Sequence, residues 1–501
     1  RQKIEMLTKD IKTIVDFIKN CSSSTLPIYK QIVWNSKNNC HKKVFISLKT
    51  NKNQRYEYIN EAIERGAIAI ISDQLINKSK LVKDVPFFIK KELSKTYNNF
   101  LDHIYDYPLK NKKIVGITGT DGKSSMVNLI AQAYTRLGIK VGVISSAGNG
   151  IYPILIKSSY TTPRPDILFG QFYNMNLKKA KIIIIECSSQ ALDQGRIDNI
   201  KFNTSIITNI FSDHLDYHKS EKRYIKSKFK LINMTSDHIL INKDCKKSIK
   251  EIFRMQTKAK IHLYGVLDNS LTDQLSERKF SKFTINPVDN SPTKQVIISK
   301  NKKISIKSSL HGHVNLYNIL VVFILLNNDK KIISKIINVI HKLTTIKGRN
   351  QIINSSSYGS FIIDYAHTPS SLLNLLRYSR KTIDSNKKII TIFGCGGDRD
   401  VWKRKEMGAI ASKYSDIIII TDDNPRSEDS SIIINHILMG VKKTKNVFII
   451  PSREKAISKA ISLANSNSLT IIAGKGNEND IIYKNKIIKH NDIKILRALI
   501  I

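Results

Sequence analysis

Apolar, β-branched runs alternate with amphipathic segments along the last third of the chain. The runs are FIIDYA, IITIF, IIIIT, VFII and LTIIAG, and segments such as PSSLLNLLRYSRKTI and REKAISKAISLAN place apolar residues at helical spacing. Continuous apolar runs of this length are typical of strands that are buried on both faces of a parallel sheet. Strict alternation of strand and helix therefore predicts a doubly wound, Rossmann-like α/β domain over residues 346–501.

The same patterning divides the rest of the chain. The strand KVFISL, the helix EYINEAIERGA and the strand IAIISD predict a first domain over residues 1–107. Residues 107–113 contain Pro108 and several charges, which indicates a linker. A second α/β domain, residues 108–345, ends with LHGHVNLYNILVVFILLNN and a basic helix. Three domains fit a chain of 501 residues of which 41% are hydrophobic.

Two polar loops follow apolar runs in the third domain. They are GCGGDRDVWKRKEMG, residues 394–408, and TDDNPRSED, residues 421–429. Open α/β sheets bind their ligands at the carboxyl ends of the strands, where both loops are expected. Arg399 and Arg426 offer two rigid guanidinium forks, and Asp423 and Asn424 offer acceptors, a set suited to a small zwitterion. The alternative is a pair of solvated turns, because Asp, Asn, Pro and Gly all favour turns.

A Gly-rich turn in the second domain predicts a phosphate site. An apolar strand, residues 114–118, leads into the turn, and the helix that follows ends at Gly138. Backbone N–H groups and the positive helix end would face an anion, with Lys123 at the outer phosphates and Ser124 at Mg²⁺. Ile117 stands where the strict G-x-x-x-x-G-K-[ST] pattern requires its first glycine, so the pattern alone leaves an ATP site open.

A series of motifs gives the chain a family resemblance. In order they are TGTDGKSS, TTP (161–163), ECSSQALDQGRID (186–198), SDHLDYH (212–218), DYAHTPSSL (364–372), GCGGDRD, DNPR and GKGNE (474–478). From about Val44 onward the chain resembles the Mur ligases in motif order and approximate spacing. Before that the match is faint, with Asn35-Ser36-Lys37 where Asp-Ser-Arg is usual.

The resemblance implies a central P-loop-type ATPase domain and an ATP-dependent amide ligase of peptidoglycan precursor synthesis. DNPR is typical of members that add meso-diaminopimelate to UDP-N-acetylmuramoyl-L-alanyl-D-glutamate. ATP would convert the substrate carboxylate into an acyl phosphate, with Lys123 at the phosphates. Glu186 and His214 would bind Mg²⁺ together with a carbamylated lysine, Lys228, four residues after Tyr224.

Each of these metal residues also has a plain structural reading. Glu186 could be a solvated strand end, His214 a residue of a capped turn, and Lys228 a solvated charge on its helix. Lys226 and Lys230 leave the register of the lysine open.

The resemblance also implies three groups of binding residues. ATP would contact Gly119, Thr120, Asp121, Gly122, Lys123, Ser124, Ser125, Asn318, Arg349 and Asp364. The UDP-muramoyl dipeptide would contact Ser36, Thr161, Thr162, Ser188, Gln194 and Arg196. Diaminopimelate would contact Arg399, Asp423, Asn424, Arg426, Gly474 and Glu478. His367 is interpreted as a structural histidine that ties a loop.

Several positions depart from the family pattern. Asp121 replaces the usual Asn, Ser124-Ser125 replace Thr-Thr, and Gln190 and Asn477 each replace a His. A hydroxyl remains at position 124 and the other changes exchange polar groups. They therefore bear on catalytic efficiency more than on the type of reaction.

The charge of the chain is misleading. A net charge of +41 would ordinarily indicate a nucleic-acid or anionic-membrane partner. The excess is spread over the chain and accompanies abundant Ile and Asn, which indicates A/T-rich codon bias, so no nucleic-acid partner is expected. The longest apolar stretch, residues 319–326, is too short to span a membrane.

Five cysteines without C-x-x-C spacing, and no signal-peptide pattern, predict a reducing, cytoplasmic location and no disulfide framework. We expect a monomer.

Other hypotheses remain. A lysine-adding or polyglutamate-forming relative is disfavoured by DNPR and GCGGDRD. A basic nucleic-acid-binding protein or a decayed scaffold is disfavoured by the intact set Lys123, Glu186, His214, Lys228 and Arg426.

Overall fold

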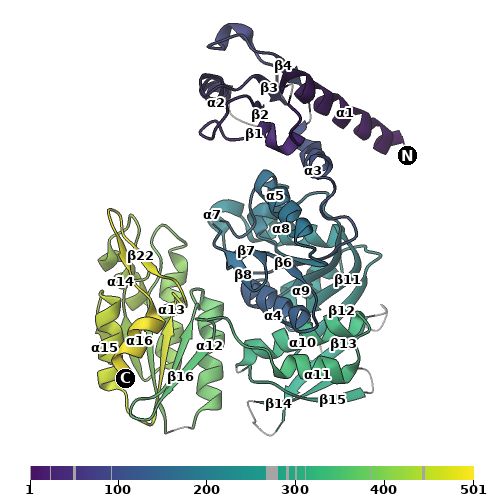
Figure 1. The fold of residues 1–501 in the computed structure, drawn as a ribbon. Coiled ribbons are helices and arrows are strands. Elements are labelled where there is room, and N and C mark those ends of the chain that lie inside the picture. Colours follow the sequence, from purple (N-terminus) through teal and green to yellow (C-terminus); the bar gives the residue numbers. More distant parts are fainter. Residues whose placement is uncertain are drawn as a thin grey trace. The chain divides into compact units, whose positions relative to one another are not determined.

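The computed structural model describes residues 2–22, 24–48, 52–91, 93–158, 160–266, 280–288, 293–299, 302–310, 312–384, 386–442 and 446–500 (Figure 1). The chain forms two compact units. Unit 1 comprises Arg1–Ile114, Lys140–Ile183 and Ala191–Lys201, and unit 2 comprises Val115–Ile139, Ile184–Gln190 and Phe202–Ile501.

Unit 1 contains a small parallel sheet of order β1-β2-β3-β4. Its elements are α1 (Gln2–Ser22), η1 (Ile28–Lys30), β1 (Ile32–Val33), β2 (Val44–Ser47), α2 (Lys52–Glu64), β3 (Ala69–Ser72), η2 (Lys78–Lys80), β4 (Phe87–Ile89), α3 (Leu93–Ile104), β6 (Val141–Ser145), β7 (Gly148–Ile151), β8 (Ile154–Ile156) and α5 (Pro165–Leu177). Ile59 and Ile63 of α2 pack against Phe45 and Ile70 of the sheet, since apolar residues four apart share one helix face.

Unit 2 begins with a sheet whose strands follow the order β15-β14-β13-β12-β11-β10-β5. Its elements are β5 (Lys113–Thr118), α4 (Lys123–Arg136), β9 (Ile182–Glu186), α6 (Ser189–Asp193), β10 (Phe202–Ile207), α7 (Leu215–His218), α8 (Glu221–Asn233), β11 (Thr235–Asn242), α9 (Lys246–Ile252), β12 (Lys260–Gly265), β13 (Ser281–Pro287), β14 (Lys294–Ser299), β15 (Lys302–Lys307), α10 (His313–Asn328) and α11 (Ile333–His341). β5, β10, β11, β12 and β13 run parallel, and β14 and β15 extend the sheet in antiparallel fashion.

The rest of unit 2 forms a second sheet of order β16-β17-β21-β18-β19-β20, coloured green to yellow in Figure 1. Its elements are β16 (Gln351–Ser355), β17 (Gly359–Asp364), α12 (Pro369–Thr382), β18 (Lys388–Phe393), α13 (Trp402–Tyr414), β19 (Ile417–Ile420), α14 (Ser430–Leu438), β20 (Asn446–Ile449), α15 (Arg453–Leu463), β21 (Ser468–Ala473), β22 (Asp480–Ile482), β23 (Ile487–Lys489) and α16 (Asp492–Ile500). Helices α12, α13 and α14 contribute to the core on one face, and α15 and α16 to the core on the other.

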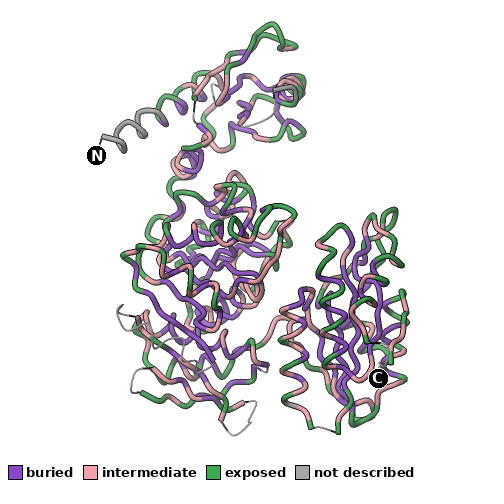
Figure 2. Tube along the Cα trace, turned by 180° about the vertical axis from the view of Figure 1, so that it is seen from behind, coloured by how far each residue is buried: buried purple, intermediate pink, exposed green. Residues whose placement is uncertain are grey.

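The predicted α/β class and the doubly wound C-terminal sheet are confirmed. Burial is almost continuous along the central strands β18 and β21, as expected for strands covered on both faces, and Figure 2 shows buried positions gathered in the interior of the fold. Three features were not predicted: the long helix α1, the antiparallel strands β14 and β15, and the antiparallel edge strand β16 with the hairpin β22–β23. The domain boundaries at residues 107 and 345 stay a prediction. In the described part of the chain, no helix combines the length and apolarity that a membrane span needs.

Candidate active site

The phosphate loop lies between β5 and α4, as the sequence predicts. Gly119 has φ of +150°, and a Cβ there would lie 1.8 Å from Oγ1 of Thr208, so the close approach of the two loops requires glycine. Gly122 adopts the left-handed conformation, with φ of +82°, directly before the first residue of α4. Asn209, two residues beyond β10, accepts a hydrogen bond from the Asp121 amide and donates to its carbonyl oxygen. The result is a rigid turn at a helix N-terminus, where an anion is favoured.

Lys123 and Ser124 stand at the entrance of this helix. The Lys123 ammonium donates to the carbonyl oxygens of Gly119 at 3.0 Å and Thr120 at 2.7 Å, so its charge lies beside the loop. The Ser124 hydroxyl lies 3.1 and 3.0 Å from the two carboxylate oxygens of Glu186, at the end of β9. A hydroxyl and a carboxylate in contact are hard oxygen ligands of the kind that Mg²⁺ prefers.

Lys228 of α8 is buried, with 2% of its surface exposed, and its Nζ donates to the Gly119 carbonyl oxygen at 2.7 Å. Burial, and then the nearby charge of Lys123, holds the pKa of Lys228 well below its ordinary value of 10.5. Lys226 is exposed and Lys230 is half-buried, so Lys228 is the lysine of this helix that lies at the phosphate loop. Its environment favours the neutral amine, which is a nucleophile.

His214 adopts a left-handed backbone conformation, with φ of +54°, immediately before α7. Burial lowers the pKa of its imidazole, and Lys123 and Lys228 lower it further, whereas Asp213 raises it. The neutral ring is therefore favoured, which is the form that ligates metals. Over the described residues, no three His, Cys, Asp or Glu side chains are grouped as a metal site. A metal at Glu186 would accordingly need further ligands, such as Ser124 and a modified Lys228.

A cavity of about 130 Å³ opens beside the phosphate loop. Asp121, Gly122, Asn318, Arg349 and Asp364 are among the residues that line it. The buried amide of Asn318 donates to the side-chain oxygen of Asn315 at 2.9 Å. The structure thus places the three remaining predicted ATP residues together with the loop. A neighbouring cavity of about 470 Å³ shares Asn318 with it.

Arg349 and Asp364 are held by their surroundings. The Arg349 guanidinium lies 4.0 Å from the ring centroid of Tyr365, and the Asp364 carboxylate accepts a hydrogen bond from the backbone N–H of Asn350 at 2.6 Å. Burial raises the pKa of Asp364, although the charge of Arg349 opposes the shift.

The phosphate loop is also bonded to the start of α12. One carboxylate oxygen of Asp121 accepts the hydroxyls of Thr368 at 3.1 Å and Ser370 at 2.8 Å. Thr368 caps α12 reciprocally with Ser371, which fixes the direction of its hydroxyl. The departure from the family's usual Asn therefore places a charged acceptor in this contact.

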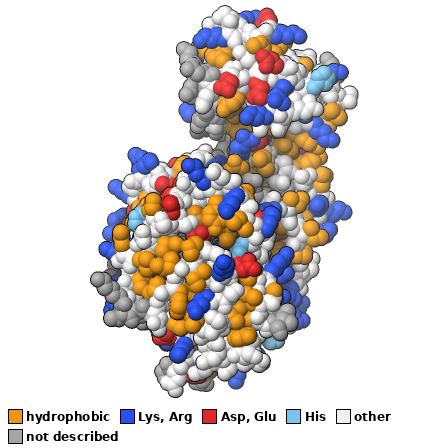
Figure 3. Space-filling model, turned by 90° about the vertical axis from the view of Figure 1, so that its left-hand side faces the viewer, with side chains coloured by type: hydrophobic (Ala, Val, Ile, Leu, Met, Phe, Trp, Pro, Cys, Tyr) orange, Lys and Arg blue, Asp and Glu red, His pale blue; other side chains and the backbone are white. Residues whose placement is uncertain are grey.

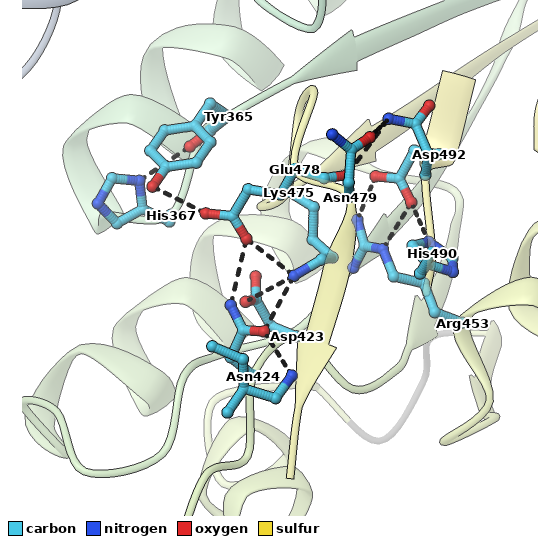
Figure 4. Close-up of polar contacts among 12 residues, drawn as sticks. Tyr365, His367, Asp423, Asn424, Arg453, Lys475, Glu478, Asn479, His490 and Asp492 are labelled. Carbon is cyan, nitrogen blue, oxygen red and sulfur yellow. Dashed lines mark hydrogen bonds and ion pairs between the residues drawn. The ribbon is translucent and has the colours of Figure 1, made fainter. Parts of the chain in front are cut away.

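The loops after β19 and β21 converge on Glu478 (Figure 4). One carboxylate oxygen of Glu478 accepts the Tyr365 hydroxyl at 3.1 Å, and the other accepts Lys475 at 2.9 Å and the Asn424 amide at 3.2 Å. Lys475 is fully buried and lies 3.8 Å from Asp423. Burial raises the pKa of Glu478, but the charge of Lys475 and these hydrogen bonds lower it by more than burial raises it. The net shift is therefore downward, and the carboxylate is ionised.

Arg426 lies at the end of the same loop, with φ of +55°. Its Nη1 donates to the Gly397 carbonyl oxygen at 2.7 Å, which joins the loop after β19 to the loop after β18. Burial lowers the pKa of Arg426, and the positive charge of Arg399 adds to the effect. An anion between the two guanidinium groups would relieve this repulsion.

Gly474 completes the group. It has φ of +113°, and a Cβ there would lie 2.7 Å from an oxygen of Asp423. All six predicted acceptor residues therefore lie on the three loops that follow β18, β19 and β21.

Comparison with known proteins decides the family. Residues 117–326 match the model of the Mur ligase middle domain, and residues 348–476 match that of the Mur ligase glutamate ligase domain. The UDP-N-acetylmuramoyl-L-alanyl-D-glutamate–2,6-diaminopimelate ligase of Buchnera aphidicola subsp. Schizaphis graminum is 34% identical, with 92% of each chain covered. The chain is a Mur ligase.

Further relatives agree with this assignment. The ligase of the same name from Coxiella burnetii is 32% identical to this Mur ligase. The match covers 87% of the present chain and 88% of the Coxiella protein. A solved structure with that name superposes with a TM-score of 0.65 at 25% identity and covers 94% of both chains. The family resemblance predicted from the motifs is confirmed.

In unit 1 the Mur ligase brings together four of the residues predicted to bind the muramoyl substrate. Arg196 donates to the Thr162 carbonyl oxygen and to the Gln194 side-chain oxygen, both at 2.8 Å, and Thr161 adjoins Thr162. Ser36 of the same unit is buried and donates to Glu61 at 2.6 Å.

Ser188 belongs to unit 2 and is half-buried two residues after Glu186. The predicted roles of these residues stay predictions.

Sequence reasoning missed Asn209, Lys475 and Tyr365. Tyr365 and Lys475 lie within recognised motifs and Asn209 lies three residues before one, so the available signal was the position of each residue at a strand end. On the face drawn in Figure 3, Lys and Arg side chains are scattered among other types and do not gather along one groove.

Proposed function

We propose that this Mur ligase uses ATP to join meso-diaminopimelate to the D-glutamyl carboxylate of UDP-N-acetylmuramoyl-L-alanyl-D-glutamate. The observation that carries the proposal is a group of residues on the loops after β18, β19 and β21, which we call the acceptor pocket: Arg399, Asp423, Asn424, Arg426, Gly474 and Glu478. It combines two guanidinium groups with two carboxylates, which complements an amino acid with two carboxylates and two ammonium groups. Relatives that carry the name of this ligase support the same assignment.

The reaction begins at the phosphate loop. A carboxylate oxygen of the substrate attacks the γ-phosphorus of ATP, the bond to the β–γ bridging oxygen breaks, and ADP leaves. Residues 119–125 hold the phosphates through their backbone amides, and Lys123 within that loop adds one ammonium group. Asn318, Arg349 and Asp364 line the adjoining cavity and hold the rest of the nucleotide.

The acyl phosphate then reacts with the amino acid. The amine nitrogen attacks the acyl carbon, inorganic phosphate departs, the amine loses a proton and an amide bond remains. The acceptor pocket serves this step by orienting the amine, because a well-placed nucleophile needs little further ordering to react.

Ser124, Glu186, His214 and Lys228 would hold magnesium, which would neutralise charge that builds on the phosphate oxygens. The hydroxyl–carboxylate contact of Ser124 with Glu186 fits such an ion. Lys228 fits as a carbamate: its neutral amine attacks carbon dioxide, an N–C bond forms and one proton is released. The lowered pKa of Lys228 supports this modification.

The muramoyl substrate would contact Ser36, Thr161, Thr162, Ser188, Gln194 and Arg196. The Arg196 fork, held by Thr162 and Gln194, supplies a fixed cation for its anionic groups. We place the reaction in the cytoplasm, where ATP is available, and expect a monomeric enzyme.

The test is ADP release from ATP in the presence of the muramoyl dipeptide, with meso-diaminopimelate, L-lysine or L-glutamate added in turn. We expect release that depends on diaminopimelate, with product mass equal to the tripeptide precursor. Equal turnover with lysine, or release that depends on glutamate, would refute the proposed acceptor.

A further inference from the structure

A fully buried arginine lies beneath the acceptor pocket. The side chain of Arg453, the first residue of α15, has no exposed surface, and its Nε and Nη2 contact the two carboxylate oxygens of Asp492 at 2.8 and 2.9 Å (Figure 4). Asp492 begins α16 and is also buried, and Nε2 of His490 lies 2.7 Å from it. The pair is bidentate, which fixes the plane of the guanidinium group.

The remaining donors of Arg453 go to backbone carbonyls of the acceptor loops. Nη2 donates to the Ala473 oxygen at 2.8 Å, and Nη1 donates to the Asp422 oxygen at 3.4 Å. These residues directly precede Gly474 and Asp423. The side chain of Arg453 therefore bonds to both segments, after β19 and at the end of β21. In each it contacts the residue directly before the first acceptor residue.

The charges of this network favour a fixed geometry. Burial raises the pKa of the Asp492 carboxyl, but Arg453 and His490 lower it by more than burial raises it. The net shift is therefore strongly downward, and the pair stays ionised. Buried ion pairs add little net stability compared with apolar side chains of similar volume, because desolvation offsets the attraction. Their directional hydrogen bonds nevertheless define where the bonded carbonyls lie.

We propose that Arg453 is a positioning residue for the acceptor step: its fork, anchored by Asp492, sets the relative placement of the loops that carry Asp423 and Gly474. The inference rests on the proposed function, because the pocket that Arg453 places is the proposed diaminopimelate site. The hydrogen bonds of Arg453 reach Asp492, Ala473 and Asp422 and no residue of the phosphate loop. Gly474 nevertheless donates its backbone N–H to the carbonyl oxygen of Asp364 at 3.1 Å, so we expect ATP binding to change less than diaminopimelate binding.

The same sheet offers a control at the amino ends of its strands, where a partly exposed arginine also joins backbone segments. Arg380 of α12 contacts Asp416 at 2.7 Å and donates to the carbonyl oxygens of Tyr414 at 2.9 Å and Lys387 at 3.3 Å. Lys387 and Asp416 directly precede β18 and β19, so this arginine joins backbone at the amino ends of the strands. An Arg380→Lys variant loses an arginine that likewise joins a carboxylate to backbone carbonyls, at a partly exposed position away from the acceptor loops.

The experiment compares Arg453→Lys with Arg380→Lys in the full-length enzyme. Each is assayed by ADP release while one of the three substrates is varied, and its thermal unfolding is recorded. Because displacement by about 1 Å can cost up to about a hundredfold in rate, we expect kcat/KM for meso-diaminopimelate to fall at least about tenfold in Arg453→Lys. The KM for ATP should stay within about twofold, and Arg380→Lys should change neither constant beyond that range.

The inference is overturned if Arg453→Lys lowers only the unfolding temperature, or if it changes the constants for ATP and diaminopimelate equally. Asp492→Asn provides a second variant, because it keeps the bonds of Arg453 to the loop carbonyls and weakens only the anchor. Asp492→Asn should cause a smaller fall in kcat/KM for meso-diaminopimelate. If Arg453→Lys does not fold, this variant serves as the test of the positioning role.

Arg426→Ala, measured in parallel, separates two kinds of failure. If Arg426→Ala impairs diaminopimelate use and the Arg453 variant does not, the positioning role is wrong and the pocket stands. If neither variant affects diaminopimelate, the proposed acceptor site itself is wrong.

Discussion

Arg426→Ala gives the sharpest test of the acceptor pocket. The substitution removes a half-buried guanidinium whose Nη1 lies 2.7 Å from the Gly397 carbonyl oxygen and whose charge is already disfavoured by Arg399. If the distal carboxylate of meso-diaminopimelate binds between the two guanidinium groups, removing one of them costs both a hydrogen-bonded ion pair and the relief of their repulsion.

The magnitude follows from burial. Truncating one partner of a buried charge pair costs about 2 to 5 kcal/mol, and half-burial places Arg426 near the lower end. A loss of about 2 to 3 kcal/mol corresponds to a fall of roughly 30- to 150-fold in kcat/KM for diaminopimelate. Loss of the bond to Gly397 should lower the free energy of unfolding by only about 1 kcal/mol.

The assay is ADP release with diaminopimelate or lysine as the varied substrate. Lysine should gain relative to diaminopimelate, because its distal ammonium no longer faces a guanidinium. The KM for ATP should hardly change. Arg497→Ala, which removes an exposed arginine from α16, is the matched control and should leave all constants unchanged. Equal losses for ATP and diaminopimelate in Arg426→Ala would refute the reasoning, as would a wild-type enzyme that uses lysine as readily as diaminopimelate.

Three further predictions concern the phosphate loop and the buried ion pair. Lys123→Ala should abolish ADP formation with an unchanged circular dichroism spectrum, since it removes a phosphate cation and no core contact; near-normal turnover would contradict the ATP site. Lys228→Ala should be nearly inactive and recover in part with added short carboxylates, and an active, metal-loaded enzyme whose mass shows unmodified Lys228 would reject the carbamate. Asp492→Asn should lower the unfolding temperature most at neutral pH. Because the folded-state pKa of Asp492 is depressed, its contribution is complete above the ordinary value of 3.8 and declines as the pH falls further, so a deficit that persists unchanged into strong acid would contradict this linkage.

Local sequence patterns were sufficient to predict the apolar strands and the loops that directly follow them. The run IITIF predicts β18 because five β-branched or aromatic residues in succession suit a doubly covered strand, and the polar residues after it must then lie at the carboxyl edge. The phosphate loop followed from glycines between a strand and a helix, and Lys228 followed only from the family resemblance. The strand and loop predictions concern residues whose neighbours in sequence already define their surroundings, whereas Lys228 contacts Gly119, 109 residues earlier.

Long-range burial was not predictable in the same way. Lys475 lies in a Gly-rich loop and would ordinarily be a solvated charge, but Asn424, fifty-one residues earlier, and Glu478 enclose it. Arg453 begins an amphipathic helix, where a basic residue normally faces water, and its partner Asp492 comes from a separate segment. Both depend on which loops the sheet order brings together, and no local pattern encodes that order.

The hydrogen bonds between Asp121 and the start of α12 affect whether the middle and C-terminal domains can be separated or exchanged. The family divides this chain into a middle model that ends at residue 326 and a C-terminal model that begins at residue 348. The hydroxyls of Thr368 and Ser370 nevertheless donate across that division to the phosphate loop. A middle domain expressed alone would carry a phosphate loop without these donors, so its nucleotide affinity would not report that of the whole enzyme. A chimera that exchanges the C-terminal domain between relatives should therefore transfer residue 121 together with the segment that begins at Thr368.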